Sequence, residues 1–415
     1  MAVRSAVIFV PDDTGKTGYE RPMFLQRIMG VPMLSWLVQS LLASGVSRYF
    51  LVCLDAHRAE AKNCFPAEAE LIVASDAEAA DLMHVFLSTA EEFEQEVMVV
   101  TGPCIRINAE SVLEGEEEAP RRACACRVGR EVFMDALDGE DFSFSHFLVE
   151  CGAAYTDHDG MFTVSDREEL ADWQPILKRA YLYELAHQGV EIWDYDNCYV
   201  EPGVRIGGGT VLLPGTIIRG ASAVGHDCVI GPNTYLENAI IGNATRVNAS
   251  QVLDSTIGSD AKIGPFSYIR ADSVLENRAQ AGRFTELRGS HLGEGSRVAQ
   301  LAYLGDTDAG RGVQFGAASV TANFDRRATH RTRIEDDAFV GSGASLVAPV
   351  EIGRGAYIAA GTTVTEDVPS QALAIGRARQ TNKKIGPAKT NGERTGLSGF
   401  ISQANEYNEN REVTS

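Results

Sequence analysis

Basic residues gather in the second half of a chain that is acidic overall, with a net charge of −20 over 415 residues. They include Arg270, Arg283, Arg288, Arg297, Arg326, Arg327, Arg331, Arg333, Arg377, Arg379 and Lys384. Guanidinium groups bind phosphate oxygens in pairs, so this local charge indicates a small phosphorylated ligand. The acidic total argues against a nucleic-acid partner. The alternative is a solvated charged rim without a ligand.

A second group that is suited to phosphate chemistry lies near the start of the chain. Lys16 follows Gly15, and Arg21 is close by. The spacing of a full phosphate-binding loop is absent, and Asp12 and Asp13 would place negative charge where phosphates must sit. This loop therefore predicts a structural or ligand-sensing role more readily than phosphoryl transfer.

The cysteines indicate a reducing compartment. Eight are scattered singly, apart from Cys124 and Cys126, and nothing supplies the remaining ligands of a metal site. No apolar run approaches the roughly 20 residues that a membrane helix needs, and the N-terminus reads as a strand rather than a signal peptide. We expect a cytoplasmic protein without membrane insertion.

The element that must position the second group of basic residues is a six-residue repeat. Aliphatic residues recur in register, each followed by Gly or another small residue, at Val200, Ile206, Leu212, Val224, Ile230, Ile257, Ile263, Val340, Leu346, Ile352 and Ile358. This period predicts a parallel β-helix with three steps to a coil, in which stacked coils share one core. The Gly should allow a tight backbone turn at each corner. Tyr303 and Asn323 are not required by the repeat, and they favour a binding site.

The first third of the chain alternates strands and helices. Buried-strand runs begin at Ser5, Arg48 and Val97, and helical spacing begins at Met33. This order predicts a parallel sheet covered by helices, with a ligand crevice at the carboxyl ends of the strands.

Together with the segment from Phe284 to Asp306 and the segment from Gly316 to Asp325, this order resembles the GlmU-type bifunctional family. The resemblance implies an α/β nucleotidyltransferase-like (Rossmann-like) N-terminal domain, followed by a left-handed parallel β-helix of hexapeptide repeats. It divides the chain into a degenerate α/β domain at 1–168, a connecting helix at 169–192, a β-helix at 193–385 and a polar tail at 386–415. Such proteins acetylate glucosamine 1-phosphate and transfer uridyl groups in the synthesis of UDP-N-acetylglucosamine, a cell-wall precursor.

The resemblance also assigns roles to individual residues. The sugar phosphate and sugar would be held by Arg270, Arg288, Tyr303, Gln314 and Asn323, of which Gln314 replaces an Asn. The acetyl-CoA groove between adjacent subunits would be lined by Ala317, Ser342, Ala360 and Arg377. The implied partners are the sugar phosphate and CoA, and the implied assembly is a homotrimer. The small corner residues are equally well explained by the repeat itself.

The departures from the family bear on catalysis. Gln300 stands where the family has the histidine that takes a proton from the sugar amine, and losing a general base costs about 10²–10⁴ in rate. His291 and His330 are the histidines that could substitute, and Thr329 replaces a Lys near the acceptor. In the first domain Met23 replaces the phosphate-binding lysine. The segment Thr101–Cys104 lacks the carboxylate that holds Mg²⁺, so Mg²⁺ is expected only if this half is active.

Two main hypotheses follow. The chain is an acetyl-CoA-dependent N-acetyltransferase of an amino sugar 1-phosphate, with uridyl transfer lost. Alternatively, it is a non-catalytic relative that binds sugar phosphate, nucleotide sugar or CoA, and regulates or scaffolds a partner. Full bifunctionality would require a rebuilt phosphate loop and metal site.

Overall fold

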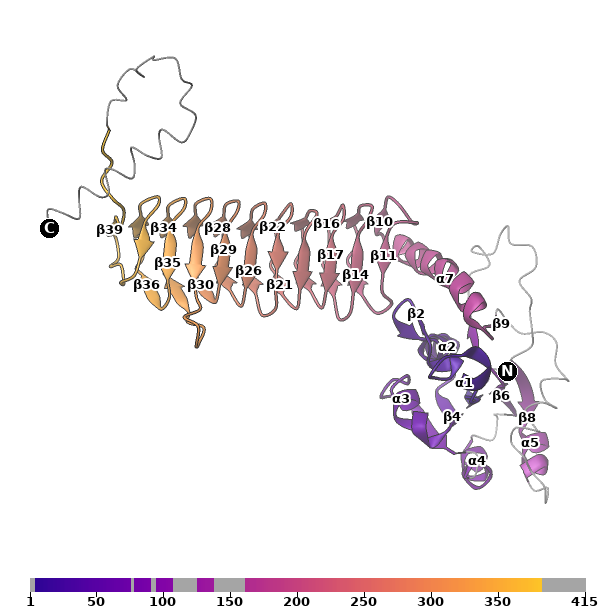
Figure 1. The fold of residues 1–415 in the computed structure, drawn as a ribbon. Helices are drawn as coiled ribbons and strands as arrows, with labels where there is room; N and C mark the ends of the chain where they lie inside the picture. Colours follow the sequence, from indigo (N-terminus) through magenta and orange to yellow (C-terminus); the bar gives the residue numbers. More distant parts are fainter. Residues whose placement is uncertain (1–3, 76–77, 91–94, 107–124, 138–160, 383–415) are drawn as a thin grey trace, which may run out of the picture. The chain divides into compact units, whose positions relative to one another are not determined.

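The structure of the protein is a computed structural model that describes residues 4–75, 78–90, 95–106, 125–137 and 161–382 (Figure 1). Residues 1–376 form one compact unit and residues 377–415 a second. Cys124 and the polar tail from residue 383 onward lie outside the described residues.

The N-terminal domain is built on a five-stranded sheet covered on both faces. Its strands lie in the order β5 (Glu70–Ala74), β4 (Arg48–Val52), β1 (Ser5–Phe9), β6 (Glu96–Val100) and β8 (Ala125–Gly129). The predicted parallel series is confirmed for the first four strands, whereas β8 pairs with β6 antiparallel, which the sequence analysis did not predict. Its helices are α1 (Thr14–Thr17), α2 (Met33–Ala43), α3 (Arg58–Lys62), α4 (Ala79–Ser88) and α5 (Arg130–Leu137).

Residues along β1 alternate between two cores. Ala6 and Ile8 pack with α2, while Val7 packs with α4 and α5. A parallel sheet that is buried on both faces needs such continuous apolar strands, so this domain is the expected Rossmann-like layer arrangement.

One long helix, α7 (Arg167–His187), contributes to two cores. At its start the Asp166 side chain accepts the Glu169 N–H at 2.9 Å, and the Glu169 carboxylate accepts the Ser165 N–H at 2.7 Å. This reciprocal pairing satisfies donors that a helix leaves open at its N-terminus. Residues of the α/β core come from its first half, Leu170, Trp173 and Leu177, and residues of the β-helix core from its second half, Leu182 and Leu185. Among the described residues, no helix has the length and apolar content to cross a bilayer.

The second half is a left-handed β-helix whose strands are two or three residues long. Successive strands join three parallel sheets in turn (Figure 1). We name each sheet by its first strand: the β10 sheet runs from β10 (Glu191–Ile192) to β39 (Leu373–Ala374), the β11 sheet from β11 (Tyr199–Val200) to β38 (Thr363–Val364), and the β12 sheet from β12 (Arg205–Ile206) to β36 (Val350–Ile352).

The predicted inward aliphatic residues form the β-helix core. All of those from Val200 to Ile358 are buried in one continuous cluster. Between Ile263 and Val340 the six-residue pattern is less regular in the sequence, but the coils continue in the structure. Ala281 and Ala309 occupy inward positions there, where the repeat would place a larger aliphatic side chain. The core therefore runs without interruption through the segment that carries the site candidates.

The corner glycines lie where side chains would clash, and the clash is with the neighbouring coil. A Cβ on Gly207 would lie 2.7 Å from the carbonyl carbon of Gly225, and one on Gly341 would lie 2.5 Å from the Ala360 nitrogen. Neither glycine has a positive φ. Glycine is needed at these corners because the backbone of the next coil passes too close for a side chain.

Truncating one inward side chain should destabilise the β-helix strongly. Leu287 in β26 (Glu286–Arg288) is fully buried, so Leu287→Ala should cost about 2–5 kcal/mol through lost transfer energy and the cavity left behind. Ile240→Ala, at an exposed outward position of the β12 sheet, is the control and should stay within about 0.5 kcal/mol. Urea unfolding followed by circular dichroism measures both; equal shifts would contradict the assigned register.

Candidate functional site

Four candidate residues occupy the same corner of consecutive coils, two residues after a strand of the β10 sheet. They are Gln300, Ala317, Ser342 and Ala360, which follow β28 (Arg297–Val298), β31 (Gln314–Phe315), β34 (Phe339–Val340) and β37 (Tyr357–Ile358). The carbonyls of the first three accept backbone N–H groups of the next corner at 3.0, 2.8 and 2.9 Å. Stacking thus turns residues far apart in sequence into one column, which we call the corner column.

Arg377 is not a member of the corner column. The equivalent position after β39 is Gly376, and Arg377 begins the second unit of the chain. Gln314 also lies apart from the other substrate candidates, since it starts β31 and faces outward on the β10 sheet. The sequence analysis had assigned Gln314 to the sugar site and Arg377 to the acetyl-CoA groove.

The remaining substrate candidates share the β11 sheet. Arg270 follows β23 (Tyr268–Ile269), Arg288 ends β26, Tyr303 begins β29 (Tyr303–Gly305), and Asn323 follows β32 (Val320–Ala322). These four strands are consecutive neighbours in the sheet. The fold therefore brings four of the five substrate candidates onto one face.

Gly305 makes room for two of these side chains. A Cβ on Gly305 would lie 2.6 Å from Asn323 Nδ2 and 2.7 Å from the Tyr303 hydroxyl. Asn323 is only 6% exposed and donates to Asp306 Oδ2 at 2.6 Å. Tyr303, Asp306 and Asn323 thus form a compact group over Gly305, which we call the tyrosine cluster. The sequence analysis quoted Asp306 only as part of a motif.

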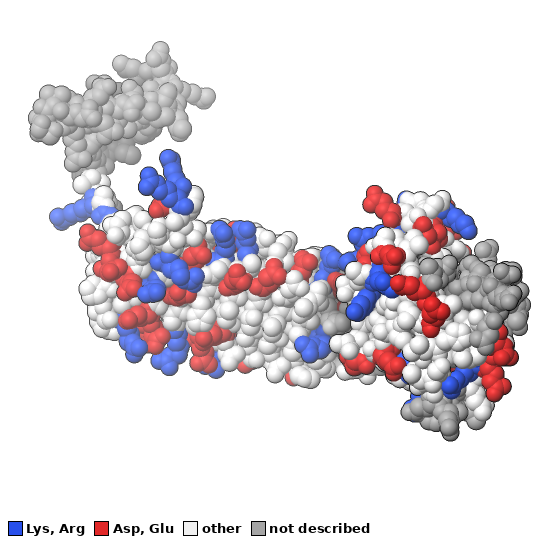
Figure 2. All heavy atoms as spheres, turned by 90° about the horizontal axis from the view of Figure 1, so that it is seen from below, with Lys and Arg blue, Asp and Glu red and all other residues white. Residues whose placement is uncertain are grey.

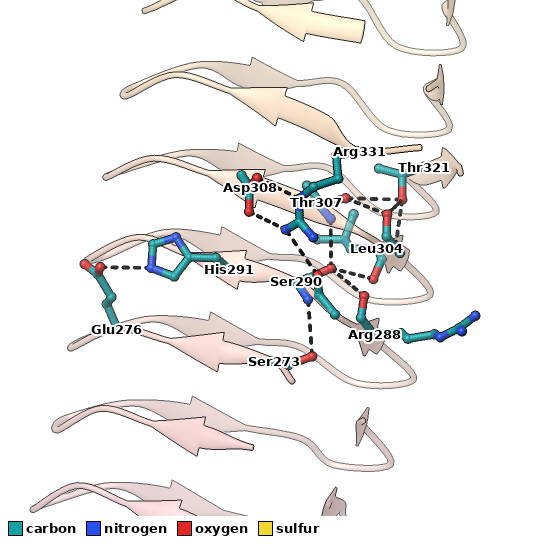
Figure 3. Close-up of polar contacts among 12 residues, drawn as sticks. Ser273, Glu276, Arg288, Ser290, His291, Leu304, Thr307, Asp308, Thr321 and Arg331 are labelled. Carbon is teal, nitrogen blue, oxygen red and sulfur yellow. Dashed lines mark hydrogen bonds and ion pairs between the residues drawn. The ribbon is translucent and has the colours of Figure 1, made fainter. Parts of the chain in front are cut away.

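The two arginines differ in availability. Arg270 Nη1 bonds Glu286 Oε1 at 2.9 Å, and this carboxylate raises the pKa of the guanidinium. The guanidinium of Arg288 makes no ion pair with another described residue, and Figure 3 shows it extending away from His291 on the β12 sheet. Arg288 is therefore the cation beside the tyrosine cluster that is open to an anionic ligand.

Several arginines of the β-helix are compensated, among them Arg331 and Arg333 of the expected basic patch. On the β12 sheet and its corners, ion pairs join Arg278 to Glu294, Arg331 to Asp308, Arg333 to Glu351 and Arg354 to Asp336. Figure 2 shows basic and acidic side chains side by side over the β-helix on the face it presents. For these residues the solvated rim explains the charge better than a ligand does.

An apolar stripe that the sequence analysis missed lies one residue after the corner-column position, in the coil of Gln300 and the two coils before it. Phe266, Phe284 and Leu301 are 60%, 54% and 60% exposed and all have positive φ. The left-handed conformation costs a non-glycine residue roughly 1–2 kcal/mol. The two phenyl rings stack at 5.2 Å, and with Tyr268 and Tyr303 the stripe lines an open pocket of about 380 Å³. The only sequence signal was a large residue at a corner where the repeat expects a small one.

The two candidate replacement histidines lie in different places. His291 in β27 (His291–Leu292) bonds Glu276 on the β12 sheet, and Figure 3 shows it on the side opposite Arg288. His330 lies in the loop between β32 and β33 (Thr332–Ile334). Its ring bonds Asp325 at 2.9 Å, and its backbone N–H donates to the Asn323 carbonyl. Only His330 is next to the tyrosine cluster.

In the first domain, the acidic loop binds its own backbone. Asp13 Oδ1 accepts the Met23 N–H at 2.9 Å, and burial raises the pKa of this carboxyl. Asp12 accepts the Thr14 hydroxyl, a bond that lowers the pKa of Asp12. Arg21 pairs with Glu60 at 2.7 Å. These contacts bind both carboxylates to donors nearby in the chain, and they leave Arg21 compensated.

The described residues contain no group of three or more His, Cys, Asp or Glu side chains that could hold a metal ion. The segment Thr101–Cys104 brings no carboxylate, so the described residues of the first domain do not fit a Mg²⁺ site. Cys126 is buried in β8. The described cysteines thus give no support for a metal pair.

Residues 331–366 match the family model for the bacterial transferase hexapeptide (six repeats). The chain is 44% identical over 221 residues to the bifunctional protein GlmU of Geobacillus sp. (strain WCH70), covering 53% of this chain and 48% of that protein. It is 45% identical over 233 residues to the protein of that name from Caldanaerobacter subterraneus subsp. tengcongensis, covering 56% and 51%. The chain thus spans about half the length of the curated relatives it matches, and over that half its sequence is similar to that of GlmU proteins.

Solved structures with a similar fold include a UDP-N-acetylglucosamine acyltransferase from Francisella novicida. It has a TM-score of 0.32 and 17% identity, and the match covers 44% of this chain and 65% of that one. The corresponding Arabidopsis acyltransferase has a TM-score of 0.27 and 16% identity, covering 45% and 69%.

The bond between Asn323 and Asp306 predicts a pH-dependent variant. In Asn323→Asp two carboxylates would face each other, so the pKa of one rises in the folded state. Stability should then match the wild type near pH 4 and fall by about 1–3 kcal/mol as the pH rises to about 8. Thermal unfolding at both pH values measures this. Gln300→Glu adds the same charge at an exposed corner and should show no such loss; a pH-independent Asn323→Asp would contradict the contact.

Proposed function

We propose that the β-helix half transfers an acetyl group from acetyl-CoA to the amino group of an amino sugar 1-phosphate such as glucosamine 1-phosphate. The observation that carries this proposal is the open Arg288 beside the tyrosine cluster on the β11 sheet. A guanidinium holds a phosphate through paired hydrogen bonds, while a hydroxyl and an amide orient sugar hydroxyls. Arg270, already paired with Glu286, would contribute less to the phosphate than Arg288.

The corner column supports the donor half of the proposal. Ala317, Ser342 and Ala360 present small side chains in line, so a pantetheine arm can lie against the coils without displacing bulky groups. Arg377, one residue beyond the column, is the proposed partner of a CoA phosphate. Acetyl-CoA supplies the thioester; the chain's own residues bind and orient the acceptor.

A second copy of the chain would complete the site. The corner column precedes the strands of the β11 sheet, whereas Arg288 and Asn323 stand at their carboxyl ends. Donor and acceptor therefore meet most simply if the column of one copy faces the tyrosine cluster of another. The exposed Phe266, Phe284 and Leu301 stripe suits such a contact, because removing it from water is favourable. We infer a homotrimer in the cytoplasm, the arrangement that the GlmU-type relatives imply.

Uridyl transfer is proposed to be lost. Asp13 holds the Met23 N–H, Arg21 is paired with Glu60, and the segment Thr101–Cys104 brings no carboxylate for Mg²⁺, which leaves little besides Lys16 to stabilise phosphoryl transfer at this loop. The first domain then serves a structural or ligand-sensing role.

One observation favours a second candidate function, in which the chain binds sugar phosphate, nucleotide sugar or CoA without turnover. An amide at Gln300 cannot accept a proton in the working pH range, and Gln300 lies where the family carries its base. The assay below separates the two functions.

The first test is acetyl-CoA-dependent thiol release with glucosamine 1-phosphate. Wild type should turn over, and Arg288→Ala should lose about 10–100-fold in kcat/KM, because a charge-assisted bond is worth roughly 1.5–3 kcal/mol. Arg246→Ala, an exposed arginine on the β10 sheet, is the matched control and should match wild type. Absence of turnover in wild type with retained binding of either ligand would support the binding function instead.

The second test is release of pyrophosphate from UTP and N-acetylglucosamine 1-phosphate with Mg²⁺. None should be detected from a preparation that is active in the acetyl-transfer assay, because Asp13 takes the place of a phosphate. Release above the enzyme-free rate would refute the loss of this activity.

A further inference from the structure

We propose that His330, oriented by Asp325, is the proton acceptor of the acyl transfer, in place of the missing base at position 300. The inference rests on the proposed function and adds a catalytic residue to it. Nothing in the family pattern assigns this role to the loop between β32 and β33.

The carboxylate of Asp325 is fixed within the loop by three bonds. Its Oδ1 accepts the N–H groups of Arg327 and Ala328, both at 2.8 Å, and its Oδ2 bonds His330 Nε2 at 2.9 Å. These donors, with the Ala328 N–H foremost, hold the pKa of Asp325 well below its ordinary value. Asp325 is therefore a permanent acceptor, and the loop is pinned around it.

This bond determines which ring nitrogen of His330 can accept a proton. An ionised carboxylate has no hydrogen to donate, so neutral His330 must donate through Nε2. The Nδ1 lone pair is then free, and among the described residues Nδ1 has no hydrogen-bond partner. A histidine that is oriented by a carboxylate through one nitrogen and accepts through the other has the geometry of a general base.

The backbone holds His330 against the acceptor side of the site. Its N–H donates to the Asn323 carbonyl at 2.7 Å, and the Asn323 amide belongs to the tyrosine cluster. Gln300, by contrast, precedes β29 and lies at the opposite end of the same sheet. A sugar bound by the tyrosine cluster would therefore lie at the end of the β11 sheet where the loop of His330 begins, and not at the end where Gln300 lies.

The charged groups around His330 leave it able to accept a proton. Arg331, which follows it, is bound to Asp308 on β30 (Thr307–Ala309), and Asp306 accepts Asn323. Arg326 and Arg327 are exposed on the same loop. The remaining neighbour is Asp325 itself, which stabilises the imidazolium formed when the proton arrives.

The step balances without another reagent. The amine lone pair attacks the thioester carbonyl, the amine proton passes to His330 Nδ1, and the C–S bond breaks with its electron pair on sulfur. The proton on His330 then returns to the leaving thiolate. The products are the N-acyl sugar phosphate and free CoA thiol.

The experiment compares His330→Asn with His291→Asn in the full chain. Both histidines are partly exposed and bond a carboxylate at 2.9 Å, but His291 lies on the β12 sheet away from Arg288. His330→Asn should lower kcat by about 10²–10⁴ with KM for glucosamine 1-phosphate little changed, and His291→Asn should leave both unchanged. Wild-type kcat should fall at acidic pH as the imidazole is protonated, and this acid limb should vanish only in His330→Asn.

Two further variants guard against a merely structural effect. His330→Gly should regain part of its kcat when imidazole is added, and Asp325→Asn should lose less than His330→Asn because the imidazole is still present. Wild-type kcat with an intact acid limb in His330→Asn would overturn this inference and leave the proposed function standing. No turnover in wild type under any condition would overturn the proposed function and the inference with it.

Discussion

Backbone hydrogen bonding between successive coils is the constraint on which the rest of the structure depends. Each coil places its donors and acceptors against the next one, and the corners come close enough that Gly207 and Gly341 cannot carry a side chain. Side chains alternate between the two faces of a strand. Once one residue faces the core, the residues on either side of it in the strand must therefore face outward. The regular spacing of the coils therefore fixes the positions of the side chains on their surface.

Because the coils are in register, equivalent residues of successive coils form columns. The proposed site consists of residues from such columns. Gln300 and the small residues of three further coils align at one corner, while Arg288, Tyr303 and Asn323 lie in or directly after three successive strands of the β11 sheet. Side chains in neighbouring coils are roughly 5 Å apart, a spacing suited to an extended ligand that contacts one coil after another. Precision comes from the scaffold, so the loop of His330 is the part of the site that can differ in shape between relatives.

The faces of the β-helix differ in whether their arginines form ion pairs. On the β12 sheet, arginines form ion pairs with carboxylates of neighbouring coils. These arginines are therefore not available to bind an anionic ligand. The β11 sheet carries Arg288 without an ion-pair partner among the described residues, and the strained apolar stripe lies at the corner where the strands of this sheet begin. An uncompensated cation and exposed aromatic rings on one sheet are costly for an isolated chain and useful for one that binds ligand and partner there.

The sequence by itself determined the repeat, the inward aliphatic positions and the alternating strands of the first domain, because these depend on local periodicity. It also identified Tyr303 and Asn323 as residues that the repeat did not require, and the resemblance added Arg288. Only the tertiary structure separated Gln314 from these residues, joined Asp306 to Asn323 and revealed the Phe266 stripe. It also placed His330, and not His291, beside Asn323, since these contacts cross coils and corners whose stacking no single stretch of sequence encodes.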